Sequence, residues 1–281
     1  MRAPVNGLRR EYARMAEERH RLVALTREVS PAFAACELTH LTREPIDVGL
    51  ARRQHAAYEA LLVELGCDVE RLPEERELPD SVFVEDAAVV VDELAVITRP
   101  GAESRRGETA TVAAALARHR QLARIEAPAT LDGGDVLRLG KRLFVGLSAR
   151  SSREGVTQLG ALLAPFGYAV EGVPLDGCLH LKTAVTEVAE GTLVINPTWI
   201  DRAAFAAYEQ IEVDPSEPFA ANALRVAGGD GEDTAVVPAA FPRTAERLAQ
   251  RGLRVRTLDV SEIAKAEGGV TCCSILLRAA S

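Results

Sequence analysis

The chain has 281 residues, of which 47% are hydrophobic and 26% charged, so it predicts a globular protein with a substantial core. Its net charge of −8 argues against nucleic acid or an anionic membrane as the main partner, and no apolar run is long enough to span a bilayer. The 5 cysteines include no CxxC pair, which argues against a zinc knuckle or a thioredoxin-type motif and suits a reducing cytoplasm.

The first third of the chain predicts a polar arm followed by mixed α/β structure. Residues 1–20 are rich in arginine and glutamate and are expected to lie outside a single domain over residues 21–281. Residues 22–29 predict a strand, 30–35 a loop and 36–41 a second short strand. Apolar residues at helical spacing predict a helix over 47–66 that ends at Gly66, and a strand follows at 68–72.

A unit of strand, hairpin, helix and strand then repeats. Its hairpins are predicted at 81–91 with 94–98, 130–139 with 142–147, 178–188 with 192–196, and 222–227 with 234–238. Helices are predicted at 104–121 and 151–166. The last copy, 271–277, has no return strand of its own, and we expect the strand at 22–29 to supply it.

The spacing of the repeat predicts a ring. One polar or cysteine residue marks each unit, and these markers are about 42 to 50 residues apart: Asp86, Asp132, His180, Asn222 and Cys272. Periods of that size are typical of propellers or arrays. Five units whose two ends complete each other predict a closed α/β propeller with pseudo-fivefold symmetry. An open mixed α/β sheet is the alternative.

A ring would direct the polar residues of its strands toward one axis. Each has a purely structural interpretation when taken alone: a histidine satisfied in the core, a turn at Asp132-Gly133-Gly134-Asp135, and cysteines that act as small hydrophobes. The adjacent Glu85 and Asp86 are harder to explain, because burying two carboxylates is costly unless a cation or donor meets them. Cysteine, histidine and carboxylate together form the nucleophile, base and orienting group of covalent catalysis.

Several motifs carry a resemblance to a known family. They are residues 78–86 (LPDSVFVED), 98–102 (TRPGA), 104–106 (SRR), 131–136 (LDGGDV), 179–182 (LHLK) and 271–274 (TCCS). Together they resemble the dimethylarginine dimethylaminohydrolase family of guanidine-modifying proteins, which has the five-bladed pentein fold. The resemblance runs from about residue 22 to the C-terminus. It implies hydrolysis of mono- or asymmetric dimethyl-L-arginine to L-citrulline and methylamine or dimethylamine through a covalent thiouronium intermediate, with no cofactor and no resident metal.

The resemblance also implies a role for individual residues. Cys272 would be the nucleophile, His180 the general acid and base, and Asp132 the group that orients the histidine. The guanidinium would be held by Asp80, Glu85 and Asp86, and the α-carboxylate of the substrate by Arg105 and Arg150. A lid loop would correspond to residues around 30–36, with Phe33 at its apolar tip.

The chemistry of a guanidinium agrees with these roles. The group is planar, cationic and a poor electrophile, so carboxylates are needed to fix its plane and keep it protonated. The bound cation also favours a thiolate at Cys272. Zinc is a conceivable inhibitor, since thiolate and imidazole are its ligands. The rival functions are arginine deimination, amidino transfer, and non-catalytic binding of an arginine derivative.

Overall fold

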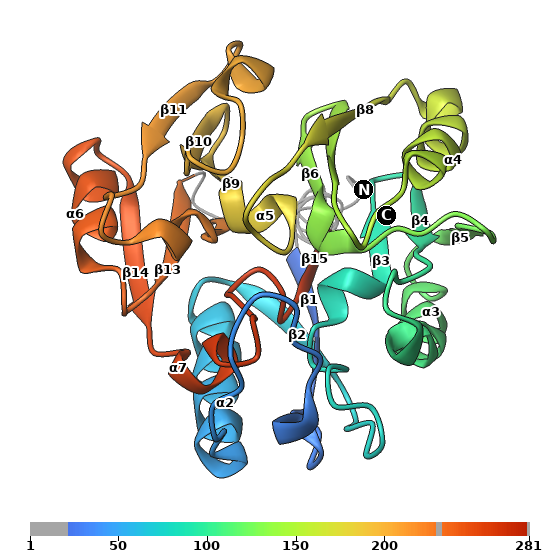
Figure 1. Ribbon diagram of the computed structural model, residues 1–281, viewed down its shortest axis with the longest axis horizontal. Helices are drawn as coiled ribbons and strands as arrows, with labels where there is room; N and C mark the ends of the chain where they lie inside the picture. Colours follow the sequence, from blue (N-terminus) through green and yellow to red (C-terminus); the bar gives the residue numbers. More distant parts are fainter. Residues whose placement is uncertain (1–21, 229–231, 280–281) are drawn as a thin grey trace, which may run out of the picture.

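The computed structural model describes residues 22–228 and 232–279, so the predicted N-terminal arm lies outside the described residues. Five three-stranded sheets, called blades one to five in the order of their first strands, surround a central axis with helices on the outside (Figure 1). The predicted five-bladed α/β propeller is therefore confirmed, and the alternative of one open sheet is excluded for this part of the chain.

The blades are built from short strands. Blade one contains β3 (Ala88–Val90), β4 (Leu94–Ile97) and β5 (Gln121–Arg124), and blade two contains β6 (Val136–Leu139), β7 (Arg142–Leu147) and β8 (Ala169–Pro174). Blade three contains β9 (Val185–Ala189), β10 (Thr192–Ile195) and β11 (Glu209–Glu212), and blade four contains β12 (Leu224–Ala227), β13 (Asp233–Pro238) and β14 (Arg254–Leu258). Blade five contains β15 (Ile275–Arg278), β1 (Leu22–Arg27) and β2 (Cys67–Leu72).

All five blades share one pairing pattern. The first strand is antiparallel to the second, and the second is parallel to the third. In blade five, Ala24 of β1 pairs with Leu276 of β15 on one side and with Val69 of β2 on the other. The N-terminal strand thus supplies the return strand of the last blade, as predicted, and this pairing closes the ring.

Helices cover the outside of the blades, and the first of them begins and ends at residues that favour the ends of helices. They are α2 (Val48–Glu64), α3 (Thr109–Leu116), α4 (Arg153–Leu163) and α6 (Pro242–Gln250), while the short α5 (Leu181–Ala184) lies near the axis and the short α7 (Ser261–Ala264) lies beside α2. Asp47 caps α2 by accepting the N–H of Leu50 at 2.9 Å. Gly66 follows α2 with a φ of 92°, where a residue with a side chain would be strained.

The predicted first strands are shorter than expected, because their polar N-terminal parts form helical turns. Turns η2 (Val84–Ala87) and η4 (Gly133–Asp135) and the short helix α5 immediately precede β3, β6 and β9, and η7 (Pro218–Ala221) ends shortly before β12. Buried carboxylates in these segments accept backbone N–H groups, as Asp86 does from Gly134. Side-chain acceptors of this kind compete with strand pairing and favour turns.

The predicted strand over 36–41 is also wrong. The short helix η1 (Phe33–Ala35) is followed by an irregular segment. The backbone N–H groups of Glu37, Thr39, His40 and Leu41 donate to the carboxylates of Asp80 and Glu267 instead of to a neighbouring strand.

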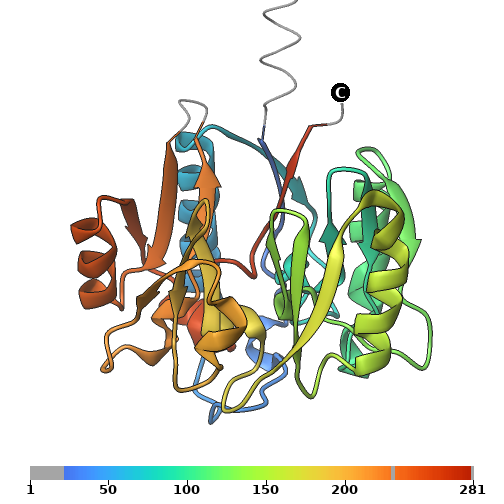
Figure 2. The ribbon, with the colours of Figure 1, turned by 90° about the horizontal axis from the view of Figure 1, so that it is seen from above.

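The hydrophobic core is divided into clusters between neighbouring blades, so the axis itself is free for polar residues. Seen from the side, α5 lies near one face of the ring, while β1 begins and β15 ends at the opposite face (Figure 2). The described helices include none with the length and apolar character needed to cross a membrane. The face that carries α5 holds the candidate site.

One buried hydroxyl links the outer helix α2 to the last blade. Tyr58 donates to the carbonyl of Val270 at 2.9 Å and shares a hydrogen bond of 2.7 Å with Ser274 Oγ. We expect Tyr58→Phe to lower the free energy of unfolding by about 1–3 kcal/mol in urea titrations, because it leaves buried polar groups without a partner. The matched control is Tyr208→Phe, since the Tyr208 hydroxyl makes no hydrogen bond within the described residues, and its effect should stay below about 0.5 kcal/mol. Equal stability of the two variants would contradict this account.

Candidate active site

The polar residues marked by the repeat lie at the axis, on the turns that precede the first strands. Asp86 belongs to η2 of blade one, Asp132 is the N-cap of η4 in blade two, and His180 is the N-cap of α5 in blade three. Cys272 lies in the turn before β15 of blade five. Closure of the ring therefore brings together side chains that are far apart in the sequence.

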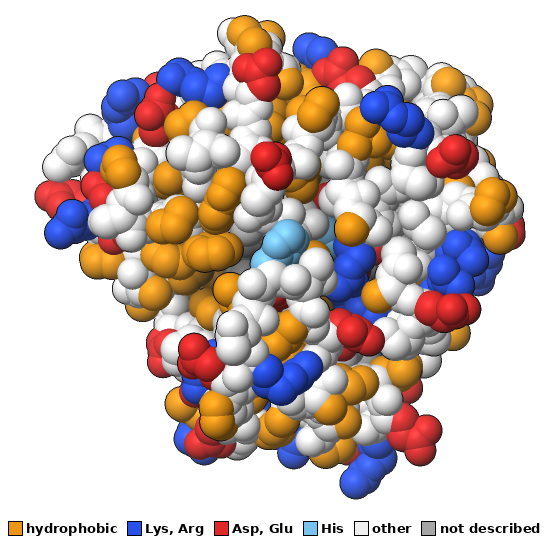
Figure 3. Space-filling model, viewed as in Figure 1, with side chains coloured by type: hydrophobic (Ala, Val, Ile, Leu, Met, Phe, Trp, Pro, Cys, Tyr) orange, Lys and Arg blue, Asp and Glu red, His pale blue; other side chains and the backbone are white. Residues whose placement is uncertain are grey.

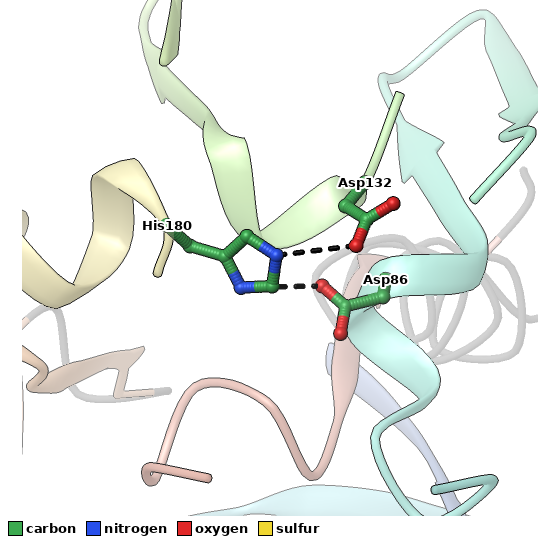
Figure 4. Close-up of side chains that lie close together, drawn as sticks. All are labelled: Asp86, Asp132 and His180. Carbon is green, nitrogen blue, oxygen red and sulfur yellow. Dashed lines mark hydrogen bonds and ion pairs between the residues drawn. The ribbon is translucent and has the colours of Figure 1, made fainter. Parts of the chain in front are cut away.

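Carboxylates surround His180 (Figure 4). Its Nε2 lies 3.2 Å from Oδ2 of Asp132, and its Nδ1 lies 3.9 Å from Oδ1 of Asp86. Burial by itself lowers the pKa of His180, but the charges of Asp86, Asp135 and Asp132 outweigh it and raise the pKa to about 9. His180 is thus an imidazolium at neutral pH.

Donors from two loops hold Asp132 against the histidine. Its Oδ1 accepts the N–H of Gly101 at 2.9 Å, and Nη1 of Arg150 lies 3.6 Å from its Oδ2. The backbone N–H of Asp132 donates to the Ser151 hydroxyl at 3.0 Å. Because Asp132 is fully buried and fixed in this way, it can orient His180.

Asp86 lies between two cationic groups. Arg105 Nη1 donates to its Oδ2 at 2.7 Å, and the Gly134 N–H donates to its Oδ1 at 2.9 Å. Burial alone raises the pKa of Asp86, but His180 and Arg105 outweigh it and hold the pKa at about 2. A Cβ on Gly134 would lie 2.7 Å from both Asp86 Oδ1 and His180 Nδ1, so only glycine fits at this position of the Asp-Gly-Gly-Asp motif.

The two adjacent cysteines differ in their surroundings. Cys272 is half-buried, and its Sγ accepts the N–H of Gly269 at 3.3 Å. Burial raises the pKa of the Cys272 thiol to about 12, with the charges of Glu85 and Asp86 acting in the same direction. Cys273 is only 1% exposed and belongs to the hydrophobic core. The cysteines lie in a turn and not in the predicted strand, but only Cys272 faces the site.

Two cavities meet at Cys272 and His180. The smaller one, of about 20 Å³, is lined by polar side chains that include Glu37, Asp80, Asp86, Arg105 and Arg150. The larger one, of about 260 Å³, has apolar walls that include Leu179, Phe219, Phe241 and Val260. Figure 3 shows histidine side chains at the centre of this face with hydrophobic side chains gathered on one side of them. A ligand at the junction would reach the thiol and the imidazole from either cavity.

Four of the residues predicted to bind the substrate line the smaller cavity together: Asp80, Asp86, Arg105 and Arg150. Arg105 is also paired with Glu108 at 2.8 Å, in addition to its bond with Asp86. Arg150 Nη1 makes no hydrogen bond within the described residues, and its ion-pair distance of 3.6 Å to Asp132 Oδ2 is long, so it can still bind an anion. This cavity is therefore lined by both carboxylates and guanidinium groups.

Glu85, which was predicted to hold the guanidinium with Asp80 and Asp86, lines the larger cavity and not the smaller one. Its carboxylate accepts hydrogen bonds from Lys182 Nζ at 2.7 Å and from Thr271 Oγ1 at 2.8 Å. Asn222 also binds Thr271, donating to its Oγ1 at 3.0 Å and accepting its N–H at 3.2 Å. Because Lys182 provides a closer cation, Glu85 instead holds the turn that carries Cys272.

The prediction of Phe33 as the tip of a lid is wrong. The side chain is fully buried and packs on Phe83 with ring centroids 5.9 Å apart, so it fills the core beneath the site. The segment that covers the site comes slightly later in the chain. Glu37 lines the smaller cavity, and His40 and Leu41 line the larger one.

Asp135 is a fully buried residue beside the site to which the sequence argument gave no role. Its carboxylate accepts the Ser148 and Ser151 hydroxyls at 2.6 Å each and the N–H of Leu181 at 3.0 Å. It therefore joins the start of α5, which follows His180, to the loop that contains Arg150. The only sequence signal was the second acid of the Asp-Gly-Gly-Asp motif.

Oxygen and nitrogen atoms of Asp86, Asp132 and His180 lie within 4.8 Å of one another, a spacing at which they can hold a metal ion. A histidine must be neutral to ligate a metal. Since the pKa of His180 is about 9, a metal would have to displace its proton at neutral pH. The three residues therefore suit a protonated histidine better than a bound metal ion. Zinc at Cys272 and His180 would face the same competition at both ligands.

Comparisons with known proteins agree on one group. A family model described as Arginine deiminase matches residues 71–221. The chain is 41% identical over 256 residues to N(G),N(G)-dimethylarginine dimethylaminohydrolase of Streptomyces coelicolor, a match that covers 91% of this chain and 96% of the relative. It is 38% identical over 231 residues to the protein of the same name from Pseudomonas aeruginosa, covering 82% and 89%.

A solved structure has the same fold along almost its whole length. It is a cysteine-to-serine variant of the Pseudomonas aeruginosa dimethylarginine dimethylaminohydrolase complexed with citrulline, and it superposes with a TM-score of 0.85 at 35% identity. The match covers 90% of this chain and 98% of that chain.

The charges around His180 lead to a titration experiment. NMR should give His180 a pKa of about 9, and Asp86→Asn should lower it toward the ordinary value of about 6.5. The folded pKa lies above the unfolded one, so the charged histidine stabilises the fold below a pH of about 6.5, and this contribution is lost as the pH rises through about 9. Asp201→Asn, which changes an exposed carboxylate, serves as the control. A wild-type pKa near 6.5 would contradict this charge arrangement.

Proposed function

The chain belongs to the dimethylarginine dimethylaminohydrolase family, and we propose that the residues at its axis convert Nω-methylated L-arginine to L-citrulline by covalent catalysis. The reaction is the hydrolysis of a C–N bond in a linear amidine. The observation that carries the assignment of residues is the meeting of Cys272, His180, Asp86 and Arg150 around one small polar cavity. We also propose that residues 21–281 form a single catalytic domain, and that the protein is cytoplasmic, since its cysteines are unpaired.

The cavity suggests how the substrate is oriented. Asp80 and Asp86 bind the cationic guanidinium and fix its plane, because charge-assisted hydrogen bonds are strong and directional. Arg150 binds the α-carboxylate with its Nη1, which makes no hydrogen bond within the described residues, and Arg105 adds a second positive charge to the same cavity. This orientation places the guanidinium carbon at the junction of the two cavities, beside the Cys272 thiol.

Binding of the substrate changes the charge that the thiol experiences. In the free protein the carboxylates of Glu85 and Asp86 oppose a thiolate, and the pKa of Cys272 stays at about 12. A bound guanidinium compensates that negative charge, so the thiol proton leaves to solvent when the substrate is present. The N–H of Gly269 then stabilises the sulfur anion.

The reaction proceeds in two steps. Sγ of Cys272 attacks the guanidinium carbon to form a C–S bond, and the C–N bond to the methylated nitrogen breaks as that nitrogen takes a proton from His180. Neutral His180 then accepts a proton from a water molecule that attacks the thiouronium carbon. Collapse of this adduct breaks the C–S bond, releases citrulline and returns the remaining hydroxyl proton to the sulfur. Asp132 keeps the His180 ring aligned in both steps.

Arginine deimination is the second candidate, because the matching family model is described as Arginine deiminase. Incubation with arginine, monomethylarginine and asymmetric dimethylarginine in separate reactions distinguishes the two. We expect citrulline from the methylated substrates with kcat/KM at least tenfold above that for arginine. Citrulline from arginine alone would assign the chain to deimination.

The cysteines provide a matched pair of variants for the same assay. Cys272→Ser should abolish citrulline formation while leaving the unfolding temperature unchanged, because a serine hydroxyl is a far weaker nucleophile. Cys273→Ser should keep at least about a tenth of the wild-type kcat, since this residue packs in the core. Equal loss of activity in both variants would refute the assignment of Cys272.

Arg105 and Arg150 predict that the site binds a free amino acid in preference to one whose carboxyl group is blocked. Arginine methylated on its guanidinium and amidated at its carboxyl group cannot pair with Arg150 and leaves a buried cation without its partner. We expect kcat/KM for this amide to fall at least a hundredfold below that for the free amino acid. Arg150→Ala is the control, because it should lower activity on the free amino acid and remove most of the discrimination. Similar kcat/KM for both substrates with the wild type would overturn the role of Arg150.

A further inference from the structure

A short segment of chain, residues 37–41, contributes lining residues to both cavities, and we call it the lid segment. One side of it is bound to groups that our proposed function assigns to the substrate. The N–H of Glu37 donates to the Asp80 carboxylate at 3.0 Å, and Arg150 Nη2 donates to Thr39 Oγ1 at 3.0 Å. The Ser104 hydroxyl adds a bond of 2.6 Å to Glu37 Oε1. In the free protein the lid segment thus occupies hydrogen-bonding groups of Asp80 and Arg150 that a bound substrate would need.

The other side of the lid segment is held by a single carboxylate. Glu267 Oε2 accepts the N–H of Thr39 at 2.9 Å, and Oε1 accepts the N–H groups of His40 at 2.5 Å and Leu41 at 2.6 Å. Three consecutive backbone donors directed at one anion form a concave anion-binding arrangement. Charge assistance makes each of these bonds stronger than one between neutral groups.

The backbone of Glu267 is itself unusual. Its φ is 58°, and within the described residues it is the only residue other than glycine with a positive φ. Such a conformation costs free energy for a side chain that is neither asparagine nor aspartate, and it persists where the surroundings require it. Glu267 directly precedes Gly268 and Gly269 in the turn that leads to Cys272, and it lines both cavities.

The size of the smaller cavity requires the lid segment to move. Its volume is about 20 Å³, whereas a cavity needs roughly 10–15 Å³ to hold one water molecule. A methylated arginine is many times larger, so it can pair with Asp80 and Arg150 in this cavity only when the lid segment gives up its bonds to them. The bonds to Glu267 involve no group that binds the substrate, and they can persist or re-form above it.

We propose that Glu267 is a positioning residue, a latch whose carboxylate holds the lid segment closed over the bound substrate. This inference rests on the proposed function, because it assumes that Asp80 and Arg150 exchange their lid bonds for substrate bonds. After that exchange, Glu267 is the main polar anchor of residues 39–41. The latch therefore sets how long the substrate is retained beside Cys272.

Two variants of Glu267 distinguish the loss of the latch from a loss of fold stability. Glu267→Gly removes the carboxylate and suits a φ of 58°, so we expect an unfolding temperature equal to or above that of the wild type. Glu267→Gln keeps the length of the side chain without its charge, and its effects should be intermediate. Glu246→Gln, which changes an exposed glutamate on α6, is the control.

Hydrogen exchange of the ligand-free protein tests the latch without substrate. In Glu267→Gly the amides of residues 39–41 should exchange at least tenfold faster than in the wild type, while the amides of the blade strands keep their rates. Unchanged exchange of residues 39–41 would overturn the proposal. This result does not depend on which substrate the protein uses, so it is distinguishable from a failure of the proposed function, which would appear as no citrulline from the wild type.

Steady-state kinetics with asymmetric dimethylarginine provide the second test. We expect Glu267→Gly to raise KM about tenfold and to change kcat by less than about threefold, because retention of the substrate is weakened while Cys272 and His180 remain in place. A purely structural role would instead lower the unfolding temperature and leave KM unchanged. An unchanged KM, or a loss confined to kcat, would refute the latch.

Discussion

The Asp86 carboxylate is buried between Arg105 and His180, and the remaining geometry of the site depends on this balance of charge. Removing ions from water is costly, so a buried carboxylate persists only where cations and donors compensate it. Gly134 supplies one such donor and, having no side chain, leaves room for the histidine ring. Asp132 holds the opposite side of that ring. These groups come from three different blades, so the charge cluster exists only when the ring is assembled.

The same charges explain why a neutral thiol rests beside a protonated histidine. The carboxylates that raise the pKa of His180 to about 9 also oppose ionisation of Cys272. A cationic substrate is the partner that reverses this balance, because it brings positive charge to the carboxylates and to the sulfur together. In the proposed function, selectivity for cations would therefore come from the ionisation of Cys272 as well as from binding. A free protein with a neutral thiol is also less open to oxidation, which proceeds through the thiolate.

The lid segment provides partners for buried polar groups of the site when no substrate is bound. Asp80 and Arg150 are nearly inaccessible to solvent, and each finds a partner in the lid segment, through Glu37 and Thr39. An unpartnered buried polar group costs about 1–3 kcal/mol, so the closed lid stabilises the free site. Glu267 anchors the same segment from the turn that carries Cys272, so the segment that lines the cavities and the Cys272 thiol are joined through one short turn.

Much of the fold could be predicted from the sequence, because the same structural unit repeats along the chain. Five units were indicated by the spacing of Asp86, Asp132, His180, Asn222 and Cys272, and the unpaired strands at the two ends indicated a closed ring. Strands bounded by clear turn residues were located well, as β7 (Arg142–Leu147) illustrates. Tertiary structure alone decided which neighbour each polar side chain meets: Glu85 pairs with Lys182, and Phe33 packs in the core. The physical reason is that hydrophobic period and turn chemistry are local properties of the chain, whereas the partner of a buried charge is set by contacts that form only when distant segments meet.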